Sequence, residues 1–309
     1  MRRLLLAGLG AVTLACAHGG EADIATLASN SDQLIYDAAQ KAIANRNFDS
    51  AKQYLKRLVE GFPQSNLGAE ARLSLADVYF KEGGAANYIL AISSYRDFLT
   101  LYPSHPRSGY AQFQVAEAFY KQKNAADRDQ SQTEKALDEY QKLLEIHGGS
   151  EYEETARSRI ADCRQSLARA DFVAGYFYQR TRQAYRSAVL RYQHLLNEYP
   201  DYQRIDEVLY RLAESLVKSG RVAEARPQLA RLLEEYNRSP FADDARHLME
   251  RIDSGKPLSK PAPRPRQGQK LTPAAPASPP PPPSPDPQAP APPTPTPAPS
   301  ASPSPPAVS

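Results

Sequence analysis

The sequence predicts an all-α protein: a solenoid of about five helix pairs, followed by a disordered, proline-rich tail. The chain has 309 residues, and residues 31–253 are rich in alanine, leucine, glutamate, arginine and glutamine, which favour helices. Apolar residues recur there at helical spacing, in stripes that come in pairs. Residues 257–309 hold 22 of the 28 prolines and cannot build a core. We therefore expect a signal peptide at 1–15, a flexible tether at 16–30, the helical solenoid at 31–253 and the disordered tail at 254–309.

The N-terminus has the pattern of a bacterial lipoprotein signal. Arg2 and Arg3 precede an apolar run over residues 4–15, which is too short to span a bilayer as a helix. The next motif, TLAC at 13–16, resembles a lipobox, in which the signal is removed before a cysteine that is then acylated; its leucine and small residue stand in reverse order. We expect lipidation at Cys16, and hence attachment to a membrane through acyl groups. A simple secretory signal with an incidental cysteine is the alternative.

Three helix pairs are predicted in the first half of the helical region. The first pair spans about 31–62, the second about 65–102, and the third begins near Pro106 and ends at Gly148-Gly149. A polar insert at 124–133 lengthens the turn of the third pair. The predicted core stripes of these pairs include Leu34, Ile35, Ala39, Ala51, Leu55, Leu73, Ala76, Tyr79, Ala91, Tyr95, Val115, Phe119, Ala136 and Tyr140. Each pair has one apolar face that only a neighbouring pair of the same design can cover.

A long helix over about 151–180 follows, with Ser150 and Glu153 in the pattern of a capping box. It leads into the stretch 173–200, where two helical patterns meet. Ala174 is a small residue that allows two helices to cross closely, and the aromatic residues after it fill the space beside the crossing. The second helix of this fourth pair stops at Tyr199-Pro200, because proline cannot donate the next backbone hydrogen bond.

The fifth pair has the most regular pattern. Ala213 and Ala225 lie on its two apolar stripes, with a turn at Ser219-Gly220 between them. Pro227 falls inside the second stripe, so we expect a local kink or a late helix start there. A final helix follows Ser239-Pro240 and ends near Ile252.

Charge and motif content exclude several classes of function. The net charge of +3 includes +2 from Arg2 and Arg3 and +4 from the tail after Gly255, which leaves the helical region at −3. That balance argues against a nucleic-acid surface. The five histidines lack metal-ligand spacing, and the chain has no phosphate loop or nucleophile motif. Cys163 is expected to be a buried, inert thiol. We expect no cofactor, no metal and no catalytic residues.

The pattern of alanine, aromatic residue and terminal proline resembles the tetratricopeptide repeat, here lengthened by insertions in the turns. A generic helical bundle is the alternative. The fourth pair is similar to the fourth repeat of the BamD (YfiO) family of outer-membrane assembly lipoproteins, and the resemblance covers about residues 30–252. The matching residues are Val173, Ala174, Tyr176, Phe177, Arg180, Ala184, Tyr185, Ala188, Arg191, Tyr192, Leu196, Tyr199, Pro200 and Asp201.

This resemblance implies a non-catalytic scaffold of the β-barrel assembly machine, anchored on the periplasmic face of the outer membrane of a Gram-negative bacterium. The implied partners are a BamA-like barrel subunit, other lipoproteins of the machine and unfolded outer-membrane β-barrel proteins. By position, Arg191 matches an arginine that pairs with an acidic residue of the barrel subunit. Tyr176, Phe177 and Tyr185 complete the candidate partner site. Core packing is the alternative role for Tyr176 and Phe177, and a solvated surface charge is the alternative for Arg191.

Tyr36 and Tyr79 are candidates for a substrate groove, because tyrosine can both stack on an aromatic side chain and form a hydrogen bond. Other periplasmic repeat proteins remain alternatives: a Tol-Pal-associated division coordinator or a pilus-assembly lipoprotein. The division coordinator has a coiled coil before its repeats, for which residues 17–30 are too short and too polar. A peptidoglycan enzyme would need a catalytic site that the sequence does not contain. The tail could act as a spacer toward the cell wall or be a solvated extension without a role.

Overall fold

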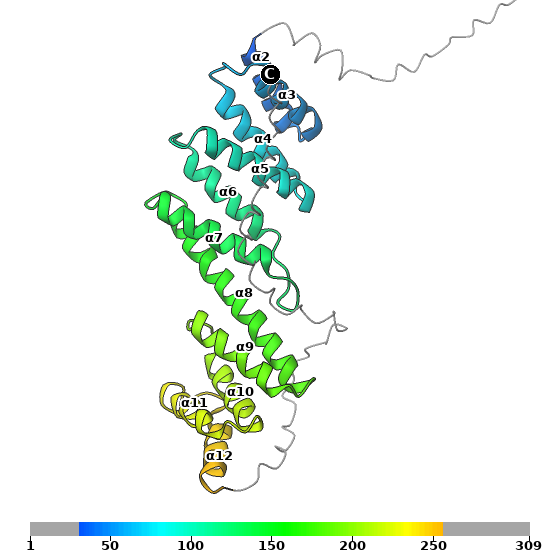
Figure 1. Ribbon diagram of the computed structural model, residues 1–309. Coiled ribbons are helices and arrows are strands. Elements are labelled where there is room, and N and C mark those ends of the chain that lie inside the picture. Colours follow the sequence, from blue (N-terminus) through cyan, green and yellow to red (C-terminus); the bar gives the residue numbers. More distant parts are fainter. Residues whose placement is uncertain (1–30, 256–309) are drawn as a thin grey trace, which may run out of the picture. The chain divides into compact units, whose positions relative to one another are not determined.

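The computed structural model describes residues 31–255, which form eleven helices and no strand (Figure 1). Five antiparallel pairs follow one another, and a single helix, α12 (Ala242–Asp253), closes the series. The pairs are α2 (Asp32–Ala44) with α3 (Phe48–Gly61), α4 (Gly68–Glu82) with α5 (Ala85–Leu101), α6 (Ser108–Tyr120) with α7 (Ser131–Ile146), α8 (Glu153–Arg180) with α9 (Tyr185–Glu198), and α10 (Ile205–Lys218) with α11 (Val222–Glu235). The predicted all-α solenoid of tetratricopeptide-like pairs is confirmed.

Several predictions fall on other parts of the chain. The signal peptide at 1–15, the tether at 16–30 with Cys16, and residues 256–309 of the tail lie outside the described residues. Among the helices that are described, none is long and apolar enough to cross a membrane.

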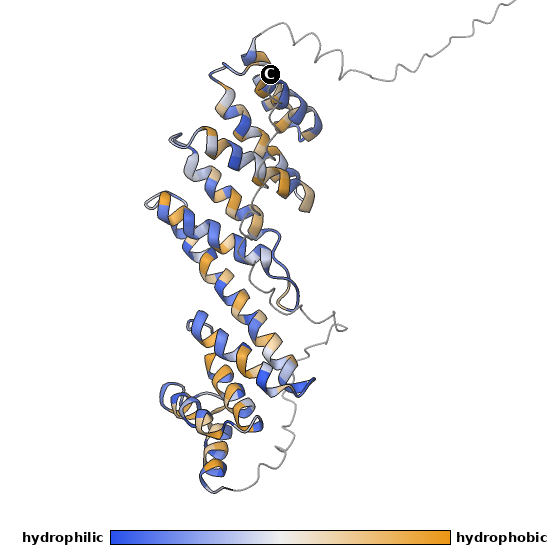
Figure 2. Ribbon diagram, viewed as in Figure 1, coloured by the Kyte–Doolittle hydropathy of each residue, from blue (hydrophilic) through white to orange (hydrophobic). Residues whose placement is uncertain are grey.

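Each helix packs mainly against the helices before and after it in the chain. Because neighbours run antiparallel, the turns inside the pairs all lie along one edge of the stack, and the connections between pairs lie along the opposite edge (Figure 1). We call these the turn edge and the connection edge. In Figure 2, hydrophobic and hydrophilic colours alternate along the helix ribbons. This is the pattern of helices that bury one face against a neighbour.

The apolar core consists of three clusters of buried residues. The first lies between α2, α3 and α4, the second extends from α4 to the first half of α8, and the third from the second half of α8 to α12. Helix α8 contributes Ala156 and Cys163 to the second cluster and Ala168 and Phe172 to the third. With 28 residues, this helix is about 42 Å long, so it joins the two clusters as predicted.

In four of the five pairs, the residue directly after the second helix is aromatic and has a non-helical backbone conformation. Phe62, Tyr102, Tyr199 and Tyr236 follow α3, α5, α9 and α11 with φ between −129° and −133° and ψ between 44° and 62°. Each donates its backbone N–H to the carbonyl four residues earlier, so the last turn is closed before the chain leaves the helix. Proline follows three of the predicted stops, but the aromatic cap is the feature that the helix ends share.

A serine after these caps joins one pair to the next. The Ser239 hydroxyl accepts from the Phe241 N–H at 3.1 Å and donates to Asp206 at 2.5 Å. In the first pair the Ser65 hydroxyl likewise accepts from the Leu67 N–H at 3.0 Å and donates to Asp32. In both cases the serine lies 33 residues after the aspartate, so each contact spans about the length of one repeat.

The structure corrects four local predictions. Helix α8 begins at Glu153, and the Ser150 hydroxyl has no hydrogen-bond partner; instead, the Glu153 carboxylate accepts from the Gly149 N–H at 2.6 Å. Helix α11 begins at Val222 and continues through Pro227, so the late start is wrong. Leu34 is 47% exposed and does not belong to the first core stripe.

The fourth correction concerns the crossing of α8 and α9. The close approach is made by Gly175, where a Cβ atom would lie 2.6 Å from Cε1 of Tyr192. Ala174, the predicted crossing residue, is half-buried. It directly precedes Gly175 and so lies about 100° away from it around the helix axis. A side chain of any size at position 175 would overlap the Tyr192 ring, so glycine is what allows this tyrosine to be fully buried.

Candidate functional site

The four candidate partner residues lie on the fourth pair, and the structure separates them into distinct contacts. Tyr176 and Phe177 are consecutive on α8, so their side chains point about 100° apart around the helix axis. Tyr185 is the first residue of α9 and Arg191 lies in its second turn. The paired aromatic residues therefore do not form one continuous surface.

Tyr176 is the exposed aromatic residue of this group, at 42%. Its ring stacks on Phe172, with centroids 6.2 Å apart and planes at 24°. The guanidinium of Arg211 lies 5.5 Å from the ring centroid and that of Arg180 lies 6.0 Å from it. The ring is thus held between cations and still presents surface to solvent, which suits a contact with a partner.

Phe177 and Tyr185 have other surroundings. Phe177 is half-buried, meets Tyr178 edge to face at 5.9 Å and lies 5.7 Å from the guanidinium of Arg182. Tyr185 is half-buried, and the Lys218 ammonium lies 5.3 Å from the centroid of the Tyr185 ring. An open hollow of about 310 Å³ lies beside Tyr185 at the turn between α8 and α9.

Arg191 is held by its own chain. Its Nη1 lies 3.3 Å from Oδ1 of Asp171, and Nδ1 of His194 lies 2.6 Å from the other carboxylate oxygen. The Asp171 side chain is 10% exposed, whereas that of Arg191 is 32% exposed. The arginine is accessible to a partner on one side, with an intramolecular acid on the other.

The two candidate groove tyrosines differ. Tyr36 on α2 is half-buried against the first core cluster. Tyr79 on α4 is 7% exposed, belongs to the second cluster and has the Lys52 ammonium 6.0 Å from its ring centroid. A ring in the core cannot stack on an incoming side chain, so the structure contradicts an open groove position for Tyr79.

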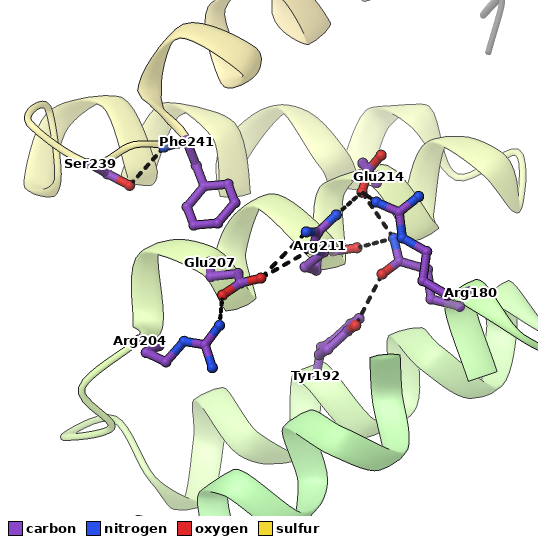
Figure 3. A network of polar contacts seen from close by, with 9 residues as sticks. Arg180, Tyr192, Arg204, Glu207, Arg211, Glu214, Ser239 and Phe241 are labelled. Carbon is purple, nitrogen blue, oxygen red and sulfur yellow. Dashed lines mark hydrogen bonds and ion pairs between the residues drawn. The ribbon is translucent and has the colours of Figure 1, made fainter. Parts of the chain in front are cut away.

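The sequence reasoning missed a buried ionic cluster around Arg211 (Figure 3). The Arg211 guanidinium is the one that lies 5.5 Å from the Tyr176 ring centroid. Glu207, Arg211 and Glu214 of α10 lie at intervals of four and three residues, and their side chains are only 9%, 13% and 7% exposed. Arg211 donates to Glu214 at 3.1 Å and to Glu207 at 3.4 Å. We call these three residues, together with Arg180, Arg204, Gln179 and Tyr192, the Arg211 cluster.

The Arg211 cluster connects three helices. Arg204, just before α10, pairs with Glu207, and Arg180 of α8 lies 3.8 Å from Glu214. Gln179 of α8 donates to Glu214 at 3.1 Å and accepts from the Tyr192 hydroxyl of α9 at 3.0 Å. Every buried carboxylate in the cluster therefore has more than one donor, as a buried charge requires.

Aromatic rings enclose the central guanidinium. Besides Tyr176, the rings of Tyr210 and Phe241 lie 5.7 Å from the Arg211 guanidinium, and these two rings stack with centroids 5.6 Å apart. Burial tends to lower the pKa of Arg211, but the carboxylates of Glu214 and Glu207 outweigh it and raise the pKa above its ordinary value. The cluster is thus a permanently charged, rigid support under the exposed Tyr176 ring.

No sequence signal singled this cluster out. Charges at four- and three-residue intervals on a helix ordinarily form a solvated face, and only the packing of α8 and the connection to α12 buries them. No group of three or more histidine, cysteine, aspartate or glutamate side chains within residues 31–255 is placed to hold a metal ion.

Comparison with known proteins agrees with this architecture. The family described as outer membrane lipoprotein, YfiO, matches residues 28–228, and a tetratricopeptide repeat family matches residues 210–254. The outer membrane protein assembly factor BamD of Haemophilus influenzae is 25% identical over 235 residues, covering 73% of this chain and 87% of that protein. BamD of Vibrio cholerae is 26% identical over 211 residues, covering 65% of this chain and 85% of that protein.

BamD of Caulobacter vibrioides is 24% identical over 194 residues, and here the match spans 63% of this chain but only 62% of the relative's length. The family match from residue 28 to residue 228 includes all of the first four helix pairs and most of the fifth. The chain therefore belongs to the YfiO (BamD) family of outer membrane lipoproteins.

Proposed function

We propose that this protein is a non-catalytic scaffold lipoprotein of the β-barrel assembly machine, which binds a BamA-like barrel subunit and helps receive unfolded outer-membrane proteins. The observation that carries the proposal is the family match over residues 28–228, together with relatives named as outer membrane protein assembly factors. The chain would lie on the periplasmic face of the outer membrane, held by acyl groups on Cys16.

Two contacts support a partner site on the fourth pair. Tyr176 presents 42% of its surface above the rigid Arg211 cluster, so a partner would bind it without ordering a mobile side chain first. Arg191 is 32% exposed and offers a guanidinium to an acidic residue of the partner, in competition with Asp171. Phe177 and Tyr185 lie on neighbouring surfaces and would contact other parts of the same partner.

The experiment is affinity capture of the full chain from detergent-solubilised envelopes, with mass spectrometry of the proteins that follow it. We expect a large barrel protein with periplasmic repeat domains, lost or strongly reduced with Arg191→Glu and Tyr176→Ala. Lys142→Glu is the charge-reversal control, because Lys142 is an exposed cation on α7, in another helix pair, without an ion pair to a described residue.

Two results would contradict this assignment. Recovery of division or pilus-assembly proteins instead of the barrel protein would overturn the function and leave the repeat fold intact. Equal loss with Arg191→Glu and Lys142→Glu would place the partner site elsewhere on the chain.

For the unfolded substrates we keep Tyr36 alone, since Tyr79 is buried. A peptide with alternating aromatic residues should bind less tightly to Tyr36→Ala than to the unmodified chain, whereas Tyr36→Phe should retain the stacking part of the affinity. Unchanged peptide binding in Tyr36→Ala, measured by fluorescence anisotropy, would remove this residue from the substrate site.

A further inference from the structure

The turn edge carries a repeated positive charge. The first helix of every pair has a cation in its last turn or directly after its end: Lys41, Lys81, Lys121, Arg180 and Lys218. A cation in this position is stabilised by the negative end of the helix dipole. All five turns lie along one edge (Figure 1), so the cations at the C-terminal ends of these helices form a row along it.

Most of these charges are not neutralised. Arg180 and Lys123 pair with Glu214 and Asp162, and Arg221 pairs with Glu224. The other exposed cations of the turns have no carboxylate within ion-pair distance among the described residues; they are Lys41, Arg46, Lys81, Lys121, Arg128, Arg182, Arg186 and Lys218. We call these eight residues the cationic edge.

The acids at the same turns are fewer. Asp49 and Glu82 both contact Lys52, and Asp127 and Asp129 lie in the loop between α6 and α7. Glu134 and Glu224 lie in the first turns of α7 and α11, where Glu224 pairs with Arg221. On the connection edge, by contrast, the first turns of α2, α4, α8, α10 and α12 contain Asp32, Glu70, Glu153, Glu154, Asp206, Glu207, Asp243 and Asp244. Four of these acids form ion pairs with arginines of the same edge, Glu70 with Arg107, Glu153 with Arg157, Glu207 with Arg204 and Asp243 with Arg246. The connection edge thus supplies cations for its acids, whereas most exposed cations of the turn edge are unpaired.

Exposed apolar side chains lie on the cationic edge as well. Ile89 and Leu90, in the first two turns of α5, are 62% and 45% exposed. Ala85 and Ala86 before them are exposed too, and hydrophobic colouring marks the start of this helix in Figure 2. The nearest turns on either side carry Arg46 and Lys121, and Lys81 lies in the last turn of the preceding helix, α4.

We propose that the part of the cationic edge around the start of α5, with Arg46, Lys81 and Lys121, lies against an anionic lipid surface. Ile89 and Leu90 would enter the boundary between the headgroups and the acyl chains. Lysine and arginine are attracted to anionic lipids over a distance of about 10 Å at moderate salt. An apolar pair flanked by cations is the arrangement by which peripheral proteins combine that attraction with apolar burial. The inference does not rest on the proposed partner, since lipid binding and capture of a barrel subunit are measured separately.

The test uses the absence of tryptophan from the chain. Ile89→Trp places one fluorescent reporter on the cationic edge. Leu101→Trp is the matched control: Leu101 is 54% exposed and ends the same helix, about 18 Å further along the axis. Both are made in the full chain with Cys16→Ser, so that no acyl group drives binding.

With vesicles of about three parts phosphatidylcholine to one part phosphatidylglycerol, we expect the emission of Trp at 89 to shift to shorter wavelength and to be quenched by brominated lipids. Trp at 101 should show neither change, and pure phosphatidylcholine should shift neither reporter. No shift at 89, an equal shift at 101, or an equal shift with neutral vesicles would each overturn the proposal.

Charge reversal tests the cations directly. Lys81→Glu with Lys121→Glu should lower the partition of the chain onto anionic vesicles at least about tenfold. The control is Lys142→Glu with Arg238→Glu, two exposed cations away from the turn edge, which should lower it much less. Equal losses in the two double variants would show that net charge alone, and not the cationic edge, attracts the chain to lipid.

Discussion

Arg191 of α9 donates to the carboxylate of Asp171 on α8, with Nη1 and Oδ1 3.3 Å apart. The same carboxylate contacts Nδ1 of His194 at 2.6 Å, and Asp171 is only 8% exposed. Arg191, which we propose to bind an acidic residue of a partner, therefore has a second role in the folded chain. Together with His194 it supplies the polar contacts of the buried Asp171 carboxylate. Binding and stability are coupled at this residue.

Arg191→Ala should lower the free energy of unfolding by about 1–2 kcal/mol, because it leaves the buried Asp171 carboxylate with a single partner. Urea unfolding followed by circular dichroism measures this loss. Arg186→Ala, at an exposed position on the same helix, should change stability by less than about 0.5 kcal/mol. Equal midpoints for the two variants would show that the contact with Asp171 is incidental.

Gly175→Ala should destabilise the protein by about 1–3 kcal/mol, although alanine is normally the better helix former by up to about 1 kcal/mol. The new Cβ would lie 2.6 Å from Cε1 of the Tyr192 ring, which is fully buried and cannot move aside. Gly61→Ala is the matched control, since its Cβ would be 3.7 Å from the flexible Arg57 side chain. There we expect unchanged or slightly raised stability, and a Gly175→Ala variant that behaves in the same way would contradict the close crossing.

The pairing of helices was predictable because alanine and aromatic residues repeat at helical spacing, and the structure confirms Ala39, Ala51, Ala91, Ala136, Ala213 and Ala225 as buried. The sequence could not predict which small residue forms the crossing of α8 and α9. Ala174 and Gly175 are adjacent, and only the rotation of α8 about its axis brings Gly175 against Tyr192. Tyr36 and Tyr79 likewise differ in burial, because Tyr79 on α4 packs inside the second core cluster, whereas Tyr36 on α2 only borders the first.

The Arg211 cluster could not be predicted from the sequence either. Its three central residues have the spacing of a solvated helix face, and burial comes from elements distant in the sequence, such as Gln179 on α8 and Phe241 before α12. Local periodicity reports which residues share a face of a helix, but not whether that face meets water or another pair. The supporting half of the candidate site was therefore visible only in the structure.

Tyr140→Phe should cost about 1–3 kcal/mol of stability, because the Tyr140 hydroxyl donates to the buried Glu117 carboxylate at 2.5 Å. Tyr192→Phe should cost less, since the acceptor there is the neutral amide of Gln179 at 3.0 Å. Tyr54→Phe is the control, at a half-buried tyrosine of the first core cluster. Chemical denaturation of the three variants checks this order, and equal costs at Tyr140 and Tyr192 would contradict the charged-acceptor argument.

Cys163 should be unreactive in the folded protein. The thiol is fully buried, and burial raises its pKa to about 11, so at pH 8 roughly one thiol in a thousand is ionised. In a Cys16→Ser background, a thiol reagent such as Ellman's reagent should label the chain only after unfolding in urea. Ser158→Cys, at an exposed position of the same helix, should react quickly in the native state.

The raised pKa of Cys163 also gives stability a pH dependence. The unfolded thiol ionises first, near its ordinary pKa of 9.0, while the folded thiol keeps its proton up to about pH 11. Between these values the unfolded state binds fewer protons, so this thiol's contribution to stability is complete below pH 9 and falls as the pH rises. Replacing Cys163 by alanine should make the unfolding midpoint less steeply dependent on pH in that window; an unchanged slope, or rapid native labelling at pH 8, would show that the thiol is accessible to solvent.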